Sequence, residues 1–224
     1  MITLPDKLPR WLAAVLFILA LAAAFWRAPN PAAPAFVPPA PAAASSLPAE
    51  FAAGLLPKAA ESAHAATLVE LPDGRLAAAW FAGSREGAAD VAIWFSTLSR
   101  DGWSKPAPIA NRESTAGGVF AHIRKVGNPV LHVEGSWLHL WYVSVGIGGW
   151  AGSSISHSVS TDAGQSWTKP TRLQTSPFLN ISTLVRNPPV PLADGGIGLP
   201  VYHEFIAKHG EWLRLSANGQ IIDK

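Results

Sequence analysis

Two side chains of opposite charge lie five residues apart in a connection rich in small residues between two apolar segments. The connection, residues 83–90, reads Gly-Ser-Arg-Glu-Gly-Ala-Ala-Asp and contains Arg85 and Asp90. An arginine binds carboxylates through two parallel hydrogen bonds, and a carboxyl group can exchange a proton with a substrate. Because neither side chain is needed to fill a core, the pair is a candidate ligand site. The alternative is an ordinary exposed loop in which Glu86 is the ion-pair partner of Arg85.

Further candidate binding residues stand just before two matched motifs. Arg124 precedes Gly-Asn-Pro-Val at 127–130, and Arg186 precedes Asn-Pro-Pro-Val at 187–190. Their equivalent placement before an apolar strand suits a shared ligand site at one end of the fold, whereas a solvated loop charge is the alternative for each. Glu204 lies at the end of a later hairpin, and we predict it to be a catalytic residue.

The composition argues against metal and nucleic-acid chemistry. The chain has no cysteine, which excludes disulfides and thiolate metal sites, and its histidines lack the spacing of a helical metal site. The formal net charge is +2 and no block of Lys and Arg is present, so a nucleic-acid partner is not expected. We expect neither a metal nor another cofactor.

A hairpin pattern repeats along the chain from residue 61 onward. Two apolar strands flank a tight turn at Asp73-Gly74, at Glu134-Gly135 and again at Asp194-Gly195, a period of about 60 residues. A second hairpin follows each of the first two, and a third is indicated near the C-terminal end. Two hairpins per period make a four-stranded blade, so the pattern predicts an all-β propeller.

A second short pattern marks the outer hairpin of each repeat. Residues 160–167 read Ser-Thr-Asp-Ala-Gly-Gln-Ser-Trp, with a shortened version at 99–103 and a degenerate one at 216–220. In such a turn Asp162 can accept hydrogen bonds from backbone N–H groups, while Gly164 can adopt a positive φ. The pattern therefore predicts a structural turn that fixes the blade and does no chemistry.

This turn resembles the Asp-box of bacterial neuraminidase (BNR) repeats, and residues 64–94 resemble the first blade of a sialidase. The resemblance covers roughly residues 64–224 and implies a β-propeller of the six-bladed sialidase type with about three blades present. We therefore expect open blade edges through which the chain could associate with itself or a partner. We also expect the chain to be truncated as an enzyme.

The resemblance also implies roles for individual residues. In sialidases an Arg that matches Arg85 binds the carboxylate of the sugar, and an Asp that matches Asp90 is the acid/base. The first arginine of the family falls on His64 here, so this recognition group is replaced. The family also uses a late tyrosine nucleophile, paired with a glutamate, and that tyrosine is not in this chain. With Arg124, Arg186 and Glu204, these residues form the predicted site.

The first sixty residues differ in kind from the rest. Residues 11–26 form an unbroken apolar run with tryptophan at both ends, which we interpret as a transmembrane anchor; a cleaved signal segment is the alternative. Lys7 and Arg10 outweigh Arg27, which predicts that residues 1–10 stay in the cytoplasm and the bulk is exported. Residues 27–60 are rich in Ala and Pro and predict an extended linker, whose last part could instead cap the domain at 61–224.

Together these features predict a single-pass, membrane-anchored domain that lies in the periplasm or outside the cell. The first functional hypothesis is an exo-glycoside hydrolase that releases terminal sialic acid or a related acidic sugar from a glycan or sialoglycoconjugate. The second is a propeller that binds carbohydrate or a partner without catalysis. Convergence of three arginines, an Asp, a Tyr and a Glu on one channel would favour the first, and an incomplete set would favour the second.

Overall fold

The structure is a computed structural model that describes residues 9–27, 33, 35–37, 48, 53–176 and 180–224. The chain separates into two compact units, Met1–Ala33 and Pro34–Lys224, and each is treated by itself. The predicted cytoplasmic residues 1–8, with Lys7, and most of the Ala/Pro-rich segment lie outside the described residues.

Among its described residues, the first unit contains one helix, α1 (Arg10–Arg27), which matches the predicted apolar run. Within the described residues it is long and apolar enough to cross a membrane, and none of its side chains is buried. A signal sequence near an N-terminus has the same properties, so the helix is a candidate for either role.

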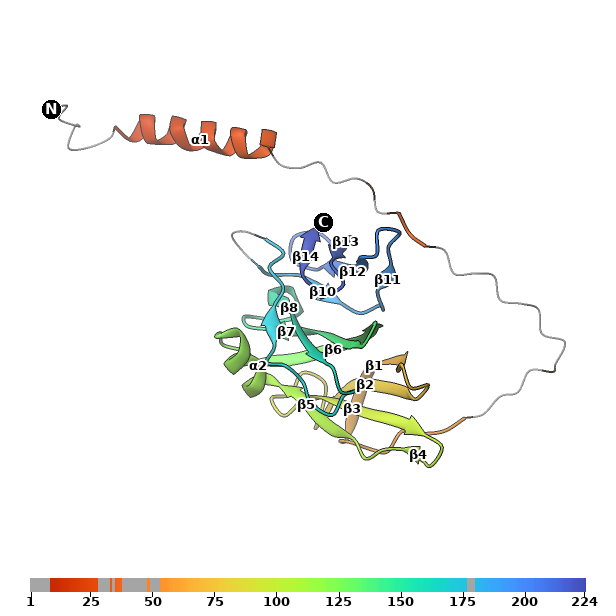
Figure 1. Cartoon of the computed structure of the whole chain (residues 1–224). Helices are drawn as coiled ribbons and strands as arrows, with labels where there is room; N and C mark the ends of the chain where they lie inside the picture. The colour runs from red at the N-terminus through yellow and green to blue at the C-terminus, as the bar shows by residue number, and fades with distance from the viewer. Residues whose placement is uncertain (1–8, 28–32, 34, 38–47, 49–52, 177–179) are drawn as a thin grey trace. The chain divides into compact units, whose positions relative to one another are not determined.

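The second unit contains three antiparallel sheets, which we call blades 1, 2 and 3 (Figure 1). The strands of blade 1 are β1 (Ser62–Glu70), β2 (Leu76–Gly83), β3 (Ala92–Ser99), β4 (Gly102–Trp103) and β5 (Ala107–Asn111). Those of blade 2 are β6 (Lys125–Glu134), β7 (Trp137–Val145), β8 (Ser153–Ser160) and β9 (Thr171–Arg172). Those of blade 3 are β10 (Leu184–Val185), β11 (Val190–Pro191), β12 (Ile197–His203), β13 (His209–Leu215) and β14 (Ile221–Asp223).

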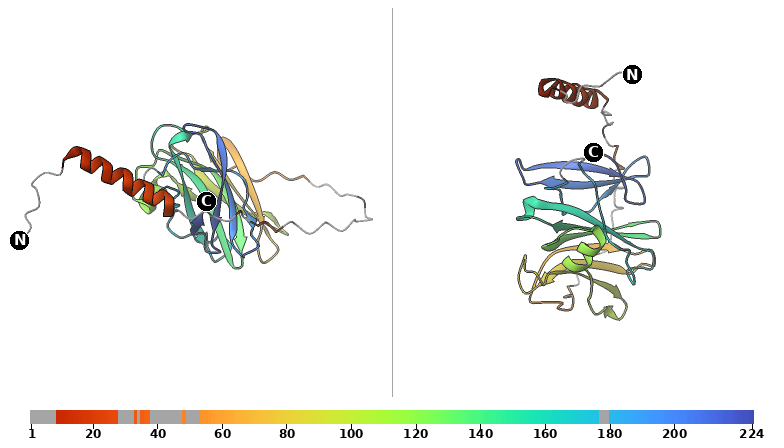
Figure 2. Two further views of the ribbon diagram at one scale, coloured as in Figure 1. Left: turned by 90° about the horizontal axis from the view of Figure 1, so that it is seen from above. Right: turned by 90° about the vertical axis from the view of Figure 1, so that its left-hand side faces the viewer.

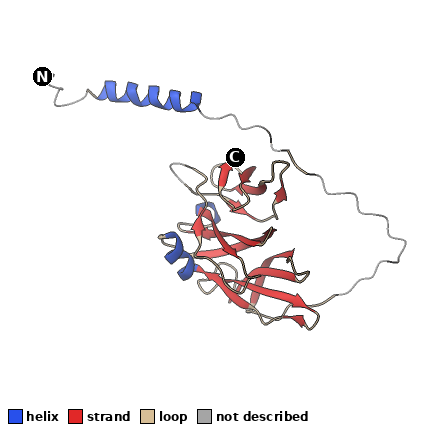
Figure 3. Ribbon diagram, viewed as in Figure 1, coloured by secondary structure: helices blue, strands red, loops and turns tan. Residues whose placement is uncertain are grey.

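The three sheets stack face to face, as the right-hand view of Figure 2 shows. Two short helices lie between strands, α2 (Arg112–Val119) before β6 and the 3₁₀ turn η1 (Trp150–Gly152) before β8 (Figure 3). The strands at Lys125–Val145 and Ser153–Ser160 confirm the predicted β-structure of the second repeat. The described fold is all-β with three propeller-type blades, as the repeat predicted.

The hairpin turns form where the glycine pattern placed them. Gly74, Gly135 and Gly195 have φ values of +81°, +59° and +81°, in the left-handed region that tight hairpin turns require. The central strands β2 and β7 are buried over almost their whole length because both of their faces meet apolar side chains.

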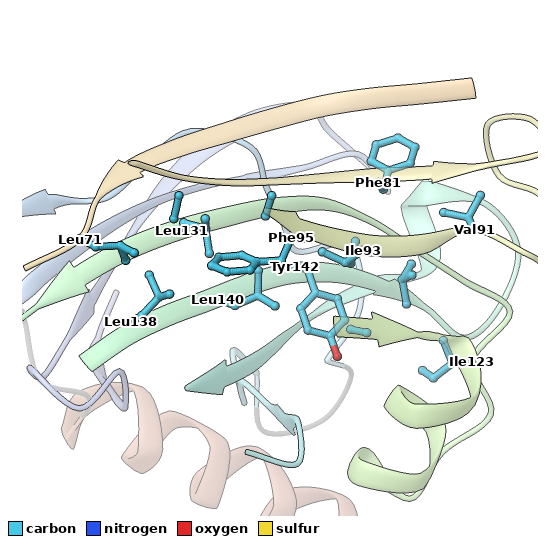
Figure 4. Close-up of a cluster of buried hydrophobic side chains, with 14 of the residues drawn as sticks. Leu71, Phe81, Val91, Ile93, Phe95, Ile123, Leu131, Leu138, Leu140 and Tyr142 are labelled. Carbon is cyan, nitrogen blue, oxygen red and sulfur yellow. The ribbon is translucent and has the colours of Figure 1, made fainter. Parts of the chain in front are cut away.

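Most of the core lies between neighbouring blades. Between blades 1 and 2, Phe81, Ile93 and Phe95 pack with Leu140 and Tyr142 (Figure 4). A second cluster between blades 2 and 3 contains Val130, Trp141, Val143, Val145, Ile155, Leu173, Leu184, Val185, Ile197, Leu199, Val201, Leu213 and Leu215. Each blade therefore depends on its neighbour to cover its apolar faces, as expected when a single repeat cannot form a core alone.

The predicted box turns connect β3 to β4 in blade 1, β8 to β9 in blade 2 and β13 to β14 in blade 3. In the full box, Asp162 accepts hydrogen bonds from the backbone N–H of Ser166 (2.8 Å) and from the hydroxyls of Ser166 (2.5 Å) and Ser160 (2.7 Å). These bonds, led by that of the Ser166 hydroxyl, lower the pKa of Asp162 to about 2. The carboxylate therefore stays ionised and serves the turn, in agreement with the structural role predicted for it.

The boxes of blades 2 and 3 also pack on the preceding blade. The backbone of Gly164 approaches the ring of Phe95 so closely that an added Cβ would lie 2.3 Å from it, and Trp167 meets the same ring edge-on. In the degenerate box of blade 3, Gly219 approaches His157 of blade 2 in the same way, at 2.5 Å. Phe95 and His157 occupy the same register position in their blades, so the contact repeats with the fold.

Short parts of the predicted linker contact the propeller. Phe36 forms a β-bridge with Leu192 of blade 3, and its ring lies 5.0 Å from that of Trp212. Leu56 and the alanines at 59 and 60 pack on the face of blade 1 that points away from blade 2. These described parts of the Ala/Pro-rich segment therefore contact blades 1 and 3.

A stack of aromatic and histidine rings lies on blade 2, where the box turn of blade 3 packs against it. His139 stacks on Trp141, with 5.0 Å between ring centroids, and shares a hydrogen bond of 2.9 Å with His157. Burial lowers the pKa of His139 to about 4 and that of His157 to about 3. Burial also lowers the pKa of nearby His132, an effect that Glu134 opposes.

The box contact predicts that Gly164→Ala will be more destabilising than Gly195→Ala. Both glycines have a positive φ, and forcing alanine into that region costs roughly 1–2 kcal/mol. A Cβ at Gly195 has nothing within 4 Å, whereas one at Gly164 collides with Phe95, and overpacking costs a further ~1–3 kcal/mol. Chemical denaturation of both variants measures the difference; equal losses of stability would show that the box does not pack on blade 1.

The histidine stack predicts that the propeller loses stability in mild acid. The folded state keeps His139 and His157 neutral down to about pH 4 and 3, whereas in the unfolded chain they take up protons below their usual pKa of about 6.5. The unfolded state then binds more protons, so stability falls as the pH drops from about 6.5 towards 4, by on the order of a few kcal/mol. Urea titrations at several pH values measure this slope.

The matched variants for that measurement are His157→Phe and His122→Gln. Phenylalanine is the residue at the equivalent position of blade 1, so the first variant removes the contribution of His157 with an aromatic ring in place, while that of His139 remains. The slope should become less steep. His122→Gln, which removes an exposed histidine outside the stack, is the control. An unchanged slope in His157→Phe would contradict the assignment.

Candidate functional site

The innermost strand of each blade is interrupted at the same place. An extra residue bulges between His64 and Thr67 in β1, and another between Gly127 and Val130 in β6. In blade 3 residues 186–189 separate β10 from β11, which both pair with β12. A bulge breaks the regular alternation of side chains along a strand. Each blade therefore presents polar groups at the same height along its inner strand.

These interruptions contribute Ala65, Asn128 and Arg186 to a cleft of about 340 Å³ that residues of all three blades line. Its lining consists of His64, Ala65, Phe81, Glu86, Asn128, Trp150, Arg186, Tyr202 and Glu204. The lining is mostly polar, with two carboxylates, one guanidinium, one phenol and one imidazole. A polar recess of this size can hold one sugar ring or a group of similar size.

Aromatic groups form the apolar part of the cleft. The imidazole of His64 stacks on the ring of Phe81, with 5.4 Å between centroids and 25° between planes. Its Nε2 lies 2.8 Å from the hydroxyl of Ser62, which fixes the orientation of the exposed ring. On the blade 2 side, Trp150 packs so closely on Gly127 that an added Cβ there would lie 2.8 Å from the indole.

The polar groups of blade 3 interact within the cleft. The amide of Asn128 donates a hydrogen bond of 3.5 Å to the hydroxyl of Tyr202. Burial raises the pKa of Tyr202, and the negative charge of Glu204 raises it further against the opposing effect of Arg186. The phenol therefore remains protonated at neutral pH and can donate a hydrogen bond. The backbone N–H of Glu204 donates to the hydroxyl of Ser182 (2.8 Å), which anchors the end of β12.

The structure brings three of the six predicted site residues together. His64, Arg186 and Glu204 line this cleft, each from a different position in the repeat. Arg124 lines a neighbouring cleft. Arg85 and Asp90 lie on the exposed loop between β2 and β3, outside the lining of the first cleft, whereas Glu86 of the same loop belongs to it.

Asp90 holds its own loop in place. Its carboxylate accepts hydrogen bonds of 2.9 Å from both the backbone N–H and the hydroxyl of Ser84. The bond from the Ser84 backbone, followed by the bond from its side chain, lowers the pKa of Asp90. A general acid must carry a proton near neutral pH. A carboxylate with a lowered pKa takes up a proton only at lower pH, so it is poorly suited to that role.

Sequence reasoning gave little weight to four members of the cleft, namely Glu86, Asn128, Trp150 and Tyr202. Asn128 had a visible signal, because an Asn-Pro pair recurs before the inner strands of blades 2 and 3. Its φ of +44° shows why asparagine is suited to this bulge. Trp150 ends a glycine-rich stretch that carries no signal of its own. Within the described part of the chain, no three metal-binding side chains cluster.

The hydrogen bonds to Asp90 predict that Ser84→Ala raises the pKa of this carboxylate towards its usual value. The variant removes the hydroxyl donor and keeps the backbone N–H, so the shift should be partial. Carbon-13 NMR of the carboxyl groups through an acid titration measures it, with Asp101 on an outer turn as the internal reference. An unchanged titration of Asp90 would show that the serine bond does not form in solution.

Comparison with known proteins relates this fold to glycan-processing propellers. Residues 74–224 match the family of BNR repeat-like domains. The Hadza microbial sialidase Hz136 is 15% identical with a TM-score of 0.58 over 71% of this chain, and the sialidase of Trypanosoma rangeli is 16% identical with a TM-score of 0.51 over 70%. An α-L-arabinofuranosidase from Lactobacillus brevis is 14% identical with a TM-score of 0.51 over 71%.

These similarities show a fold shared with glycoside hydrolases. The chain spans 36% of the length of the Hadza sialidase, 29% of the Trypanosoma sialidase and 55% of the arabinofuranosidase. Comparison with curated proteins found no match.

Proposed function

Because this chain belongs to the family of BNR repeat-like domains, we propose that it is a sialidase-like exo-glycoside hydrolase domain that acts on terminal sialic acid or a related acidic sugar. One observation carries the proposal: the interruptions of three inner strands converge on a cleft that contains Arg186, Tyr202 and Glu204. The fold similarity to glycoside hydrolases supports a carbohydrate ligand, and the side chains of the cleft support an acidic one.

Arg186 is the proposed carboxylate-binding group of the cleft. It stands at the start of the interruption in blade 3, where its guanidinium reaches the same recess as the phenol of Tyr202. A guanidinium matches a carboxylate with two parallel hydrogen bonds, and the neutral phenol can add a third. His64, in the place of the family's first arginine, offers a ring that can donate a further hydrogen bond. Arg85 and Arg124, the other two arginines predicted to bind the carboxylate, lie outside the lining of this cleft.

Glu204 is the proposed proton-transfer group. Cleavage of a glycosidic bond needs a carboxyl group that protonates the leaving oxygen, and a second group that assists on the opposite side. Glu204 and Glu86 enter the cleft from blade 3 and blade 1 respectively, so a sugar between them would have a carboxyl group on either side. Asp90, the acid/base implied by the family resemblance, lies four residues beyond Glu86 and is the competing assignment.

A turnover assay with an aryl sialoside distinguishes the two assignments. Glu204→Gln should lower kcat by about 10²–10⁴-fold, the usual contribution of a general acid or base, with the fold unchanged. Arg186→Lys should chiefly raise KM, because an ammonium lacks the planar fork. Glu70→Gln, at the exposed end of β1, is the control for loss of a carboxylate. If Asp90→Asn abolishes turnover and Glu204→Gln does not, the proton-transfer role belongs to Asp90.

A non-catalytic carbohydrate-binding propeller is the second candidate function. It is favoured by the hydrogen bonds from Ser84 that keep Asp90 ionised, because an ionised carboxylate binds but does not protonate. Saturation-transfer NMR with sialyl-lactose tests it. Binding that depends on Arg186, without turnover of any aryl glycoside, would establish this function and exclude the enzymatic one.

We further propose that α1 anchors the chain in a membrane as a single span with residues 61–224 exported. In this arrangement residues 1–10 are cytoplasmic, 11–26 cross the bilayer and 27–60 form the tether. The arginines at both ends of α1 and its apolar surface support this placement. Fractionation should recover the whole chain in membranes, with the propeller open to protease from outside the cytoplasm. Recovery of a soluble protein that begins near Phe25 would identify a cleaved signal instead.

A further inference from the structure

A second cleft, of about 360 Å³, lies beside the first and differs from it in charge. It is lined by Gly87, Ala89, Arg112, His122, Arg124, Lys125 and Gly148. Every ionisable side chain in this lining is basic. The loop between β2 and β3 supplies one wall, and the start of α2 and the segment that leads into β6 supply the other.

The cations of this cleft are held in place by contacts that do not neutralise all of them. Arg124 donates a hydrogen bond of 3.0 Å to the carbonyl oxygen of Gly148, a neutral acceptor that orients the guanidinium and leaves its charge intact. Arg112 forms an ion pair with the exposed Glu113, with 2.5 Å between Nε and Oε1. The positive charge of the cleft is therefore concentrated on Arg124 and Lys125.

Lys125 is partly removed from water. Its Nζ lies 3.9 Å from the centroid of the Trp150 ring, a cation–π contact. Burial lowers the pKa of Lys125, the expected result when an ammonium loses part of its hydration, and the nearby Glu86 opposes the effect. Such a group gains more from a bound anion than a fully solvated lysine does.

The two clefts share a thin wall. Glu86 lines the first cleft and the next residue, Gly87, lines the second. On the opposite side the indole of Trp150 belongs to the first cleft while the ammonium that rests on it, that of Lys125, belongs to the second. A glycan whose terminal sugar occupies the first cleft would thus place an adjoining residue against the cations of the second.

We propose that the second cleft is an anion-binding subsite that takes a carboxylate or sulfate group on the sugar next to the terminal one. This inference rests on the proposed function, since it assumes a glycan in the first cleft. It narrows the substrate class to glycans that carry two neighbouring acidic groups. Arg124 supplies the bidentate contact and Lys125 the point charge.

Three synthetic glycans test the subsite and separate the two sources of the anion. They share a terminal sialic acid and differ in the next sugar, which is a neutral galactose, a sulfated galactose or a second sialic acid. Calorimetry at low salt should show that at least one of the diacidic glycans binds roughly tenfold more tightly than the neutral-galactose one, and that added salt reduces this preference. Equal affinities for the three would overturn the proposal.

Matched variants assign the preference to the cleft. Arg124→Gln should bring the preference close to unity, and Lys125→Met, which keeps an apolar stem on Trp150, should reduce it. Arg100→Gln removes one positive charge from the exposed turn between β3 and β4 and should preserve it. If Arg100→Gln and Arg124→Gln reduce the preference equally, only general charge attraction is present and the subsite is excluded.

A titration with inorganic sulfate distinguishes failure of this inference from failure of the proposed function. The backbone amides of Gly87 and Gly148 should show saturable NMR shifts with sulfate, and Arg124→Gln should abolish them. If all three glycans fail to bind while these shifts are present, the first cleft is not a sialic acid site and the second still binds anions. If the shifts are absent or do not saturate, the subsite is excluded whatever the first cleft binds.

Discussion

The packing of the box turns of blades 2 and 3 on the blade before them is the contact on which the rest of this propeller depends. A glycine without a side chain lets the turn lie flat against a ring, Phe95 beneath Gly164 and His157 beneath Gly219. Beside this contact, apolar clusters fill the space between neighbouring blades. Because the repeat preserves the register position of the contact, successive blades stack in one direction and their inner strands meet at one place.

The cleft is a consequence of that stacking combined with a local defect. Regular strands would direct alternate side chains into the cores between blades, where charged groups are costly. The bulges near Ala65 and Asn128, and the four residues that interrupt the inner strand of blade 3, break the alternation at the same level in each blade. The polar groups of the three blades therefore lie together in one cleft instead of facing solvent at separate places. Loops that line this cleft also line the neighbouring basic cleft. One architecture therefore places the carboxylates in the first cleft and a group of cations in the second.

The loop between β2 and β3 shows how closely such roles can lie. Asp90 is tied to Ser84 and keeps a lowered pKa, Glu86 turns into the first cleft, and Gly87 contributes to the second. Neighbouring residues of a short connection thus serve loop structure, candidate chemistry and candidate anion binding. The two carboxylates have different environments, which is the usual way in which two similar groups acquire different tasks.

The sequence alone determined the repeat, the positions of its turns and the apolar helix Arg10–Arg27, because these depend on local spacing: glycines at turns, alternating apolar residues in strands and an uninterrupted apolar run. It also identified Arg186 and Glu204 as candidates through their places in the repeat, and His64 through the family resemblance. Only the tertiary structure decided that these three share a cleft with Glu86 and Trp150 while Arg124 faces a different one. The reason is physical. The direction in which a charged loop residue faces depends on the strand bulges and on the neighbouring blade. Neither of these produces a periodic pattern in the sequence. The hydrogen bonds that hold Asp90 likewise depend on the fold of its loop, and spacing carries no sign of them.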